Sequence, residues 1–130
     1  MSSPTQRSLA LLRKDGWTVC IVEKWVPQAR KTIDAFGFGD CLACRPGDRI
    51  SLIQTTSASN IMARYHKILS LPEAEVWLRS GGLIFVHGWA KRGGFGKRKL
   101  WSCTVKEITL LEMKAQRDEL LQASPEELTV

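Results

Sequence analysis

Several features that would place this chain of 130 residues in a special class are missing from its sequence. No apolar run reaches the roughly 18 to 20 residues that a membrane-spanning helix needs. The N-terminal stretch MSSPTQRS lacks the charged-then-apolar order of a secretory signal. The sequence also contains no internal repeat and no low-complexity segment. We therefore expect a cytoplasmic protein, in a cell or in a virus-infected cell.

The sequence has four cysteines, at Cys20, Cys41, Cys44 and Cys103, and it lacks a clear metal-binding spacing among them. Cys41 and Cys44 form a CxxC, but they fall in a stretch expected to be a strand, where residues three apart point to opposite faces. That geometry is poor for sharing one zinc ion, and no second CxxC or CxxH follows. Buried thiols in a reducing compartment are the expectation, and a zinc site is the alternative.

What the chain does contain is an ordinary globular composition with excess positive charge. Its 44% hydrophobic and 25% charged residues are typical of a folded protein, and its length fits one domain. Lys and Arg number 19 against 13 Asp and Glu, which gives a net charge of +6. Because cations neutralise phosphates, this excess favours a polyanionic partner such as DNA; a basic protein without one is the alternative.

Hydrophobic patterns and turn signals predict one α/β domain over residues 1–122, with a single mixed sheet flanked by helices. A helix is predicted from Ser3-Pro4 to a stop at Gly16. The further elements expected are strands at 17–26, 38–44 and 49–55, helices at 57–69 and 72–79, strands at 83–90 and 100–108, and a helix at about 110–122. Residues 27–35 are predicted as a polar connection, 45–48 as a hairpin turn, and 123–130 as an acidic, disordered tail.

The strongest functional signal is a set of polar residues near the expected hairpin. Side chains alternate along a strand, so Asp40 shares a face with Leu42, and Gln54 shares one with Leu52. If the hairpin pairs these strands, the carboxylate of Asp40 lies beside the segment Gln54 to Thr56, above an apolar floor. Such a cluster at the end of a sheet is suited to a metal ion.

The element order and these motifs resemble the PD-(D/E)XK nucleases, whose αβββαβ core is that of the restriction endonucleases. Gly39-Asp40, a hairpin and then Gln54-Thr55-Thr56 are similar to the signature P-D … (D/E)-x-K, and the resemblance covers about residues 4–90. Archaeal-type Holliday-junction resolvases and VRR-NUC domains are the most similar members. The resemblance implies metal-dependent hydrolysis of DNA, branched or single-stranded, and a homodimer, since a four-way junction is two-fold symmetric.

The sequence departs from this signature at several positions. Gln6-Arg7 stands where resolvases have Glu-Arg, and Thr56 replaces the Lys. Gln54 replaces the Glu, as in VRR-NUC domains, where Gln coordinates through its carbonyl oxygen. Asp40 alone matches, and one carboxylate holds Mg²⁺ weakly. A catalytically weakened member that binds nucleic acid or a protein partner is therefore an alternative, and a structural or regulatory domain is a third.

Other acids could complete the metal site. Asp34 lies six residues before Asp40 and would reach the metal if Gly37 and Gly39 let the chain fold back. Glu23 is a further candidate. The resulting hypothesis is that Mg²⁺ or Mn²⁺ binds the following groups: Asp40, the side-chain oxygen of Gln54, the backbone carbonyl of Thr55, and Asp34.

The helix after the third strand could supply the missing cation. Asn60, Arg64 and Lys67 share one face of that helix. The resemblance implies that Lys67 or Arg64 takes the role of the lysine and neutralises the phosphate, since some superfamily members use a lysine from this helix. The alternative is that Arg64 and Lys67 belong to a solvent-exposed stripe opposite the apolar face of this helix.

The segment KRGGFGKRK at residues 91–99 is predicted to bind nucleic acid. It combines three glycines with an aromatic residue and five cations, namely Phe95 and Lys91, Arg92, Lys97, Arg98 and Lys99. The alternative is an exposed hairpin tip without a ligand.

We interpret His87 as structural, with a phosphate or metal contact as its alternative, and we assign four tryptophans to packing: Trp17, Trp25, Trp77 and Trp101.

Overall fold

The structure, a computed structural model, describes residues 2–122. Its elements follow the predicted order, with two additional strands. They are α1 (Pro4–Lys14), β1 (Thr18–Ile21), β2 (Lys24–Val26), β3 (Lys31–Ile33), β4 (Cys41–Cys44), β5 (Ser51–Ser57), the 3₁₀ turn η1 (Ala58–Asn60), α2 (Ile61–Leu69), α3 (Pro72–Arg79), β6 (Leu83–Arg92), β7 (Leu100–Ile108) and α4 (Leu110–Gln122). The predicted acidic tail, 123–130, lies outside the described residues.

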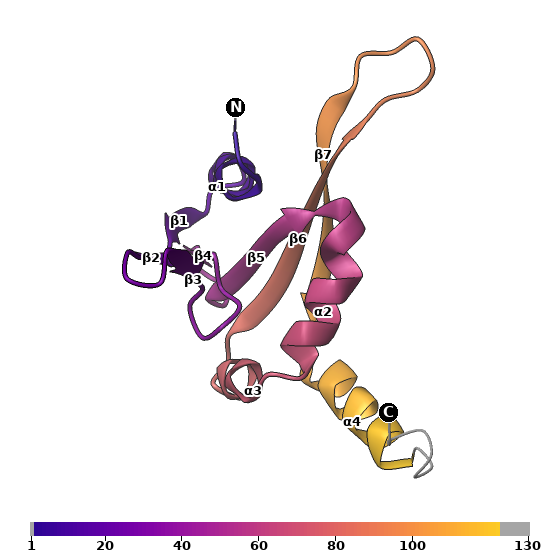
Figure 1. The fold of residues 1–130 in the computed structure, drawn as a ribbon. Helices are drawn as coiled ribbons and strands as arrows, with labels where there is room; N and C mark the ends of the chain where they lie inside the picture. The colour runs from indigo at the N-terminus through magenta and orange to yellow at the C-terminus, as the bar shows by residue number, and fades with distance from the viewer. Residues whose placement is uncertain (1, 123–130) are drawn as a thin grey trace.

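Five strands form one mixed sheet in the order β1-β4-β5-β6-β7 (Figure 1). β4 pairs antiparallel with β1 and β5, β6 runs parallel to β5, and β7 returns antiparallel to β6. The parallel step requires a crossover, which α2 and α3 provide. The predicted α/β class with a mixed sheet between helices is confirmed.

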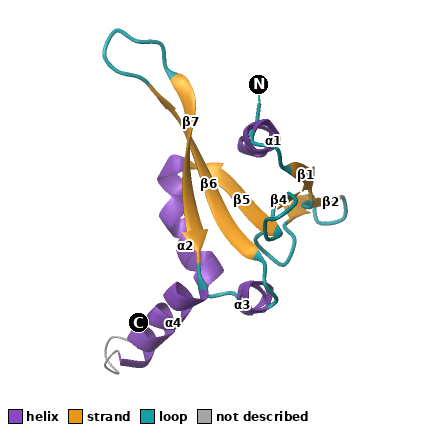
Figure 2. Ribbon diagram, turned by 180° about the vertical axis from the view of Figure 1, so that it is seen from behind, coloured by secondary structure: helices purple, strands orange, loops and turns teal. Residues whose placement is uncertain are grey.

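The two faces of the sheet carry separate apolar clusters. On one face Leu9 of α1 packs on Cys41, Ala43 and Ile53. On the other face a larger cluster joins the sheet to α2, α3 and α4 through Phe38, Leu52, Ile68, Ala74, Ile84 and Met113. α1 and α2 accordingly lie on opposite sides of the strands when the molecule is viewed from behind (Figure 2). None of the helices in the described part of the chain is long and apolar enough to cross a membrane.

The first helix begins and ends where the sequence predicts. The Ser3 hydroxyl accepts a hydrogen bond from the Gln6 backbone N–H at 3.2 Å, which satisfies one of the free donors of the first turn. Pro4 follows the cap, and Gly16 ends the helix with φ of +87°.

The single strand predicted over 17–26 is wrong. The chain leaves the five-stranded sheet after Ile21, and residues 24–26 pair instead with β3 as a separate two-stranded sheet. β3 lies within the segment predicted as a polar connection. Trp25, assigned to packing from the sequence, is 57% exposed on this ribbon. The β-branched and aromatic run predicts extended backbone, but it does not indicate which partner each half pairs with.

Two smaller boundaries also differ from the prediction. The strand expected from residue 38 begins at Cys41, because Ala35 and Gly39 bridge each other just before it. The helix expected from residue 57 opens as a 3₁₀ turn, and neither the Ser57 nor the Asn60 side chain caps a helix.

Candidate metal centre

The segment from Asp34 to Asp40 folds back on itself, as the metal hypothesis requires. Ala35 and Gly39 exchange two backbone hydrogen bonds, each of 2.8 Å, and Gly37 adopts a φ of +85°. A Cβ on Gly39 would lie 2.9 Å from Leu52 Cδ2, so a larger residue here would require the buried Leu52 side chain to shift. The turn returns Asp34 to the side of Asp40.

Asp40 lies at the point where β4 stops pairing with β5. Its backbone N–H donates to Ile53 O at 2.9 Å, and its Oδ2 accepts the Thr55 N–H at 2.7 Å and the Thr55 hydroxyl at 3.2 Å. The Asp40 carboxylate thus accepts a hydrogen bond from the Thr55 N–H of β5, which lies beyond the end of the neighbouring strand β4. The Thr55 hydroxyl also lies 2.7 Å from the hydroxyl of Thr5 in α1. Thr5 was not predicted, because no sequence pattern links it to β5.

Three carboxylates meet at this position. One oxygen from each of Glu23, Asp34 and Asp40 lies within 4.8 Å of the other two. Gln54 joins them by donating from Nε2 to Asp34 Oδ2 at 3.2 Å. Gln54 is 2% exposed, and its Oε1 is buried without a hydrogen-bond partner among the described residues. A buried acceptor without a donor is costly, and a bound cation or water at Gln54 Oε1 would satisfy it.

Burial and the closeness of the carboxylates raise the pKa values of Asp34 and Asp40. Burial, followed by hydrogen bonding and repulsion from Asp40, raises the pKa of Asp34 to about 6. Burial raises the pKa of Asp40 as well, and Glu23 adds to that rise, whereas the Thr55 N–H and Asp34 oppose it. A bound divalent cation would offset the repulsion between these carboxylates, and Mg²⁺ and Mn²⁺ prefer carboxylate and amide oxygens as ligands. The residues present therefore fit a hard divalent cation.

The two predicted cations of α2 act electrostatically on one of these acids. The charges of Lys67 and Arg64 both lower the pKa of Asp34 in part, which requires them to lie within electrostatic reach of it. Arg64 is half-buried and Lys67 is exposed. Their role in place of the signature lysine stays a prediction, with a solvated stripe as its alternative.

Other sequence-predicted residues take different positions. Thr56, in the lysine position of the signature, is buried. Thr55 contacts Asp40 through its backbone N–H and its hydroxyl. That its backbone carbonyl binds a metal ion stays a prediction. Arg7 lies with its guanidinium carbon 3.5 Å from the centroid of Trp101, and Gln6 is exposed.

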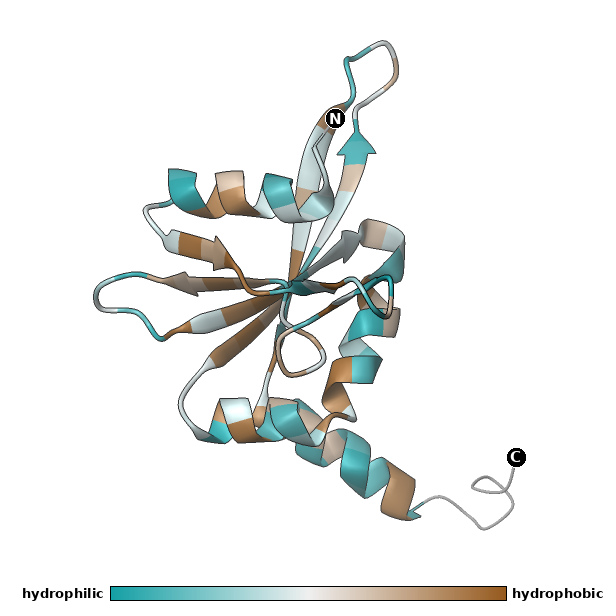
Figure 3. Cartoon of the chain, turned by 60° about the vertical axis from the view of Figure 1, so that its left-hand side comes forward, coloured by the Kyte–Doolittle hydropathy of each residue, from teal (hydrophilic) through white to brown (hydrophobic). Residues whose placement is uncertain are grey.

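The basic loop between β6 and β7 projects beyond the sheet (Figure 3). Every residue from 91 to 100 is exposed. Along β6, Arg92 lies five residues beyond His87, the partner of Thr55, which corresponds to roughly 17 Å at about 3.3 Å per residue. The loop and the acids are therefore separate surfaces at the same end of β5 and β6.

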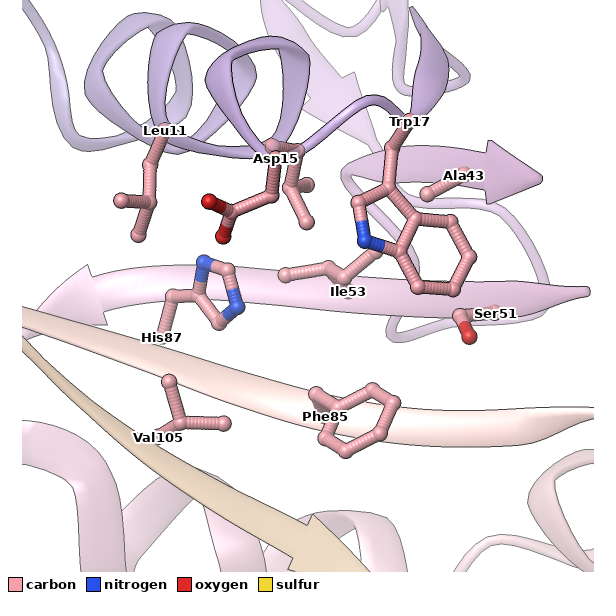
Figure 4. Close-up of a pocket in the computed structure, with 10 residues that line it drawn as sticks. Leu11, Asp15, Trp17, Ala43, Ser51, Ile53, Phe85, His87 and Val105 are labelled. Atoms are coloured by element: carbon pink, nitrogen blue, oxygen red, sulfur yellow. The ribbon is translucent and has the colours of Figure 1, made fainter. Parts of the chain in front are cut away.

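A cavity of about 210 Å³ lies between α1 and the sheet (Figure 4). Its walls are mainly apolar, with His87 and Asp15 among the polar residues. His87 Nδ1 lies 2.9 Å from Ser8 Oγ, and burial lowers the pKa of His87 to about 4. His87 is thus a neutral, hydrogen-bonded side chain of the interior, in agreement with its structural interpretation.

No family model, curated protein or solved structure matches this chain. The resemblance to the PD-(D/E)XK nucleases therefore stays a prediction, and the geometry of the carboxylate cluster carries the functional argument.

The raised pKa of Asp34 leads to a testable pH dependence. A folded-state pKa of about 6 against 3.8 means that Asp34 stabilises the metal-free protein most below pH 3.8 and loses that contribution as pH rises through about 6. The free energy of unfolding of the parent, relative to Asp34→Asn, should therefore fall between pH 4 and pH 6. Urea unfolding in chelator measures this difference; a difference independent of pH would contradict the crowding.

Proposed function

We propose that this chain is a metal-dependent nuclease that hydrolyses phosphodiester bonds in DNA. The observation that carries the proposal is the group of three carboxylates within 4.8 Å of one another, beside the unpartnered oxygen of Gln54. Like charges are brought together in a folded protein at a cost, and a bound cation offsets that cost. Such a protein would act in the cytoplasm, where its cysteines remain free.

The chain's own residues would divide the work as follows. Glu23, Asp34, Asp40 and the Gln54 oxygen would hold the cation, and Thr55 fixes the Asp40 carboxylate through its two hydrogen bonds. Bound Mg²⁺ or Mn²⁺ supplies Lewis-acid charge to the phosphate and activates water for attack. Arg64 and Lys67 would neutralise the negative charge that grows on the phosphate, the task of the lysine in the PD-(D/E)XK signature.

A catalytically weakened nuclease-fold protein that binds nucleic acid or a protein partner is the second candidate. It is favoured by Thr56, which is buried and carries no charge where the signature has lysine. The bonds between Asp40 and Thr55 would also serve a protein that only needed to satisfy the backbone of β5 beyond the end of β4. Binding without hydrolysis separates this candidate from the first.

The direct test is incubation of the purified protein with linear duplex, single-stranded and four-way-junction DNA. Cleavage of at least one substrate is expected with Mn²⁺ or Mg²⁺ and is expected to stop in chelator. Salt-sensitive binding with no cleavage in either metal would support the second candidate instead. Sedimentation of the free and DNA-bound protein tests the homodimer inferred from the resolvases.

Replacing the five loop cations by Ala should weaken DNA binding and flatten its salt dependence. Each phosphate contact contributes about −0.9 to the slope of log K against log salt for duplex DNA, so losing all five contacts would change the slope by up to about 4.5. The control replaces Arg13 and Lys14, exposed cations at the end of α1, and should change the slope little. An unchanged slope in the loop variant would exclude the loop from the interface.

A further inference from the structure

The cavity between α1 and the sheet contains a polar atom that the interior of the protein does not use. His87, on β6, lines this cavity and is 4% exposed. Its Nδ1 is bonded to Ser8 of α1, whereas its Nε2 has no hydrogen-bond partner among the described residues. Figure 4 shows one ring nitrogen toward α1 and the other turned into the cavity, on the side of Ile53. The bond that holds His87 in the fold therefore leaves Nε2 available to a ligand.

The contacts of Ser8 decide which ring nitrogen of His87 carries the hydrogen. Nε1 of Trp89, which can only donate, lies 2.9 Å from Ser8 Oγ, so the hydroxyl accepts this bond. The hydrogen of the hydroxyl then needs an acceptor, and within the described residues it meets His87 Nδ1 at 2.9 Å. Nδ1 is thus an acceptor, and Nε2 carries the hydrogen. Because burial lowers the pKa of His87 to about 4, the ring keeps this neutral form at neutral pH.

The rest of the cavity is mainly apolar and has room for a small molecule. Leu12, Ile53 and Phe85 form part of its wall. An apolar cavity of about 150 Å³ holds one benzene molecule, so a volume of about 210 Å³ corresponds to about eight or nine non-hydrogen atoms. A ligand in this space would gain dispersion contacts with all of these side chains. Asp15 and Val105 of the cavity are exposed, so a ligand can reach it from solvent.

The polar groups of the cavity restrict the chemistry of its ligand. A donor in an apolar wall requires an acceptor, and a carbonyl oxygen accepts without bringing a donor of its own. The Asp15 carboxylate borders the same cavity and disfavours an anion. We propose that this cavity binds a small, neutral, mainly apolar molecule whose carbonyl oxygen accepts a hydrogen bond from His87 Nε2. The site uses neither the carboxylate cluster nor a metal ion, so it is separate from the proposed hydrolysis.

The first test is nuclear magnetic resonance of the histidine ring nitrogens in the isotope-labelled parent protein at neutral pH. The probe is acetophenone, a neutral phenyl ketone of about the size that the cavity accommodates. The ring hydrogen of His87 is expected on Nε2, and acetophenone should shift this nitrogen and its hydrogen saturably. The other histidine of the chain, His66, is exposed and should not shift. A hydrogen on Nδ1 of His87, or a His87 signal that acetophenone leaves unchanged, would overturn the proposal.

The affinities of two probes for the parent and for His87→Phe measure the hydrogen bond itself. The second probe, α-methylstyrene, has the shape of acetophenone with a CH₂ group in place of the carbonyl oxygen. The ratio of acetophenone affinity to α-methylstyrene affinity should fall about 2- to 12-fold in His87→Phe, which corresponds to a net hydrogen bond of about 0.5–1.5 kcal/mol. His66→Phe, at the exposed histidine, is the matched control and should keep the parental ratio. An equal ratio in His87→Phe and the parent would show that no such bond forms.

The remaining outcomes also bear on the proposal. Benzoate resembles acetophenone in shape but is anionic, so Asp15 should make it the weaker ligand. Tighter binding of benzoate than of acetophenone would contradict a neutral ligand. The spectrum of the parent needs no substitution and decides the proposal even if His87→Phe does not fold. DNA cleavage and acetophenone binding are separate measurements, so failure of one leaves the other claim standing.

Discussion

Replacing Asp40 by Asn is expected to reduce Mn²⁺-dependent DNA cleavage by at least about 10²- to 10³-fold, the range found when one group that stabilises a transition-state charge is removed. The amide keeps an oxygen that accepts the Thr55 N–H and hydroxyl, so the end of β5 stays satisfied. What it removes is one negative charge from a cluster whose carboxylates lie within 4.8 Å of one another. Cleavage rates at saturating Mn²⁺ measure the effect.

Asp40→Ala is the matched control for this substitution. It removes the charge and also leaves the Thr55 N–H without its acceptor, so it should cost about 1–3 kcal/mol of stability that Asp40→Asn does not. Both variants should lose cleavage to a similar extent, whereas only the alanine variant should unfold at lower urea. Parental rates in folded Asp40→Asn would reject a role for this carboxylate in hydrolysis.

Replacing Phe38 by Ala is expected to lower the free energy of unfolding by about 3–5 kcal/mol. The ring is fully buried in the cluster that joins the sheet to α2, α3 and α4, and removing a buried Phe costs this much through lost burial and the cavity that remains. Because Phe38 anchors the turn between Asp34 and Asp40, metal affinity should fall as well. Urea unfolding and Mn²⁺ titration measure the two effects.

Phe36→Ala is the control for this second substitution, since it removes the same ring from the same motif at a position 58% exposed. A surface substitution of this kind should change stability by no more than about 0.5 kcal/mol. Similar costs for both variants, or a cost below about 1 kcal/mol for Phe38→Ala, would contradict the anchoring of the turn by Phe38.

Local patterns predict much of this site because its chemistry lies close to regular strands. Alternation of side chains places Asp40 near Gln54, and the glycines of the DAFGFGD motif indicate a reversal that returns Asp34. The spacing of Arg64 and Lys67 on one helix face is likewise a local property, and both act on Asp34. These inferences required no knowledge of contacts between distant segments.

The sequence does not predict what depends on such distant contacts. β1 ends at Ile21, opposite Cys41 of β4, and residues 24–26 pair with β3 instead; a run of strand-forming residues does not contain that information. The bond between Thr5 and Thr55 spans 50 residues, and the Phe36–Trp77 pair joins a turn to α3. Which Phe of the motif is buried is also decided by the tertiary fold, because both have the same type and similar neighbours.

Direct titration of the metal-free protein with Mn²⁺ at neutral pH, followed by calorimetry or by the paramagnetic resonance of free Mn²⁺, tests the carboxylate cluster without relying on any substrate. Saturable binding at the cluster is expected in the parent, and a loss of at least about tenfold in affinity is expected in both Asp34→Asn and Asp40→Asn. Absence of binding, or equal affinity in the parent and the two variants, would contradict a metal centre at Glu23, Asp34 and Asp40.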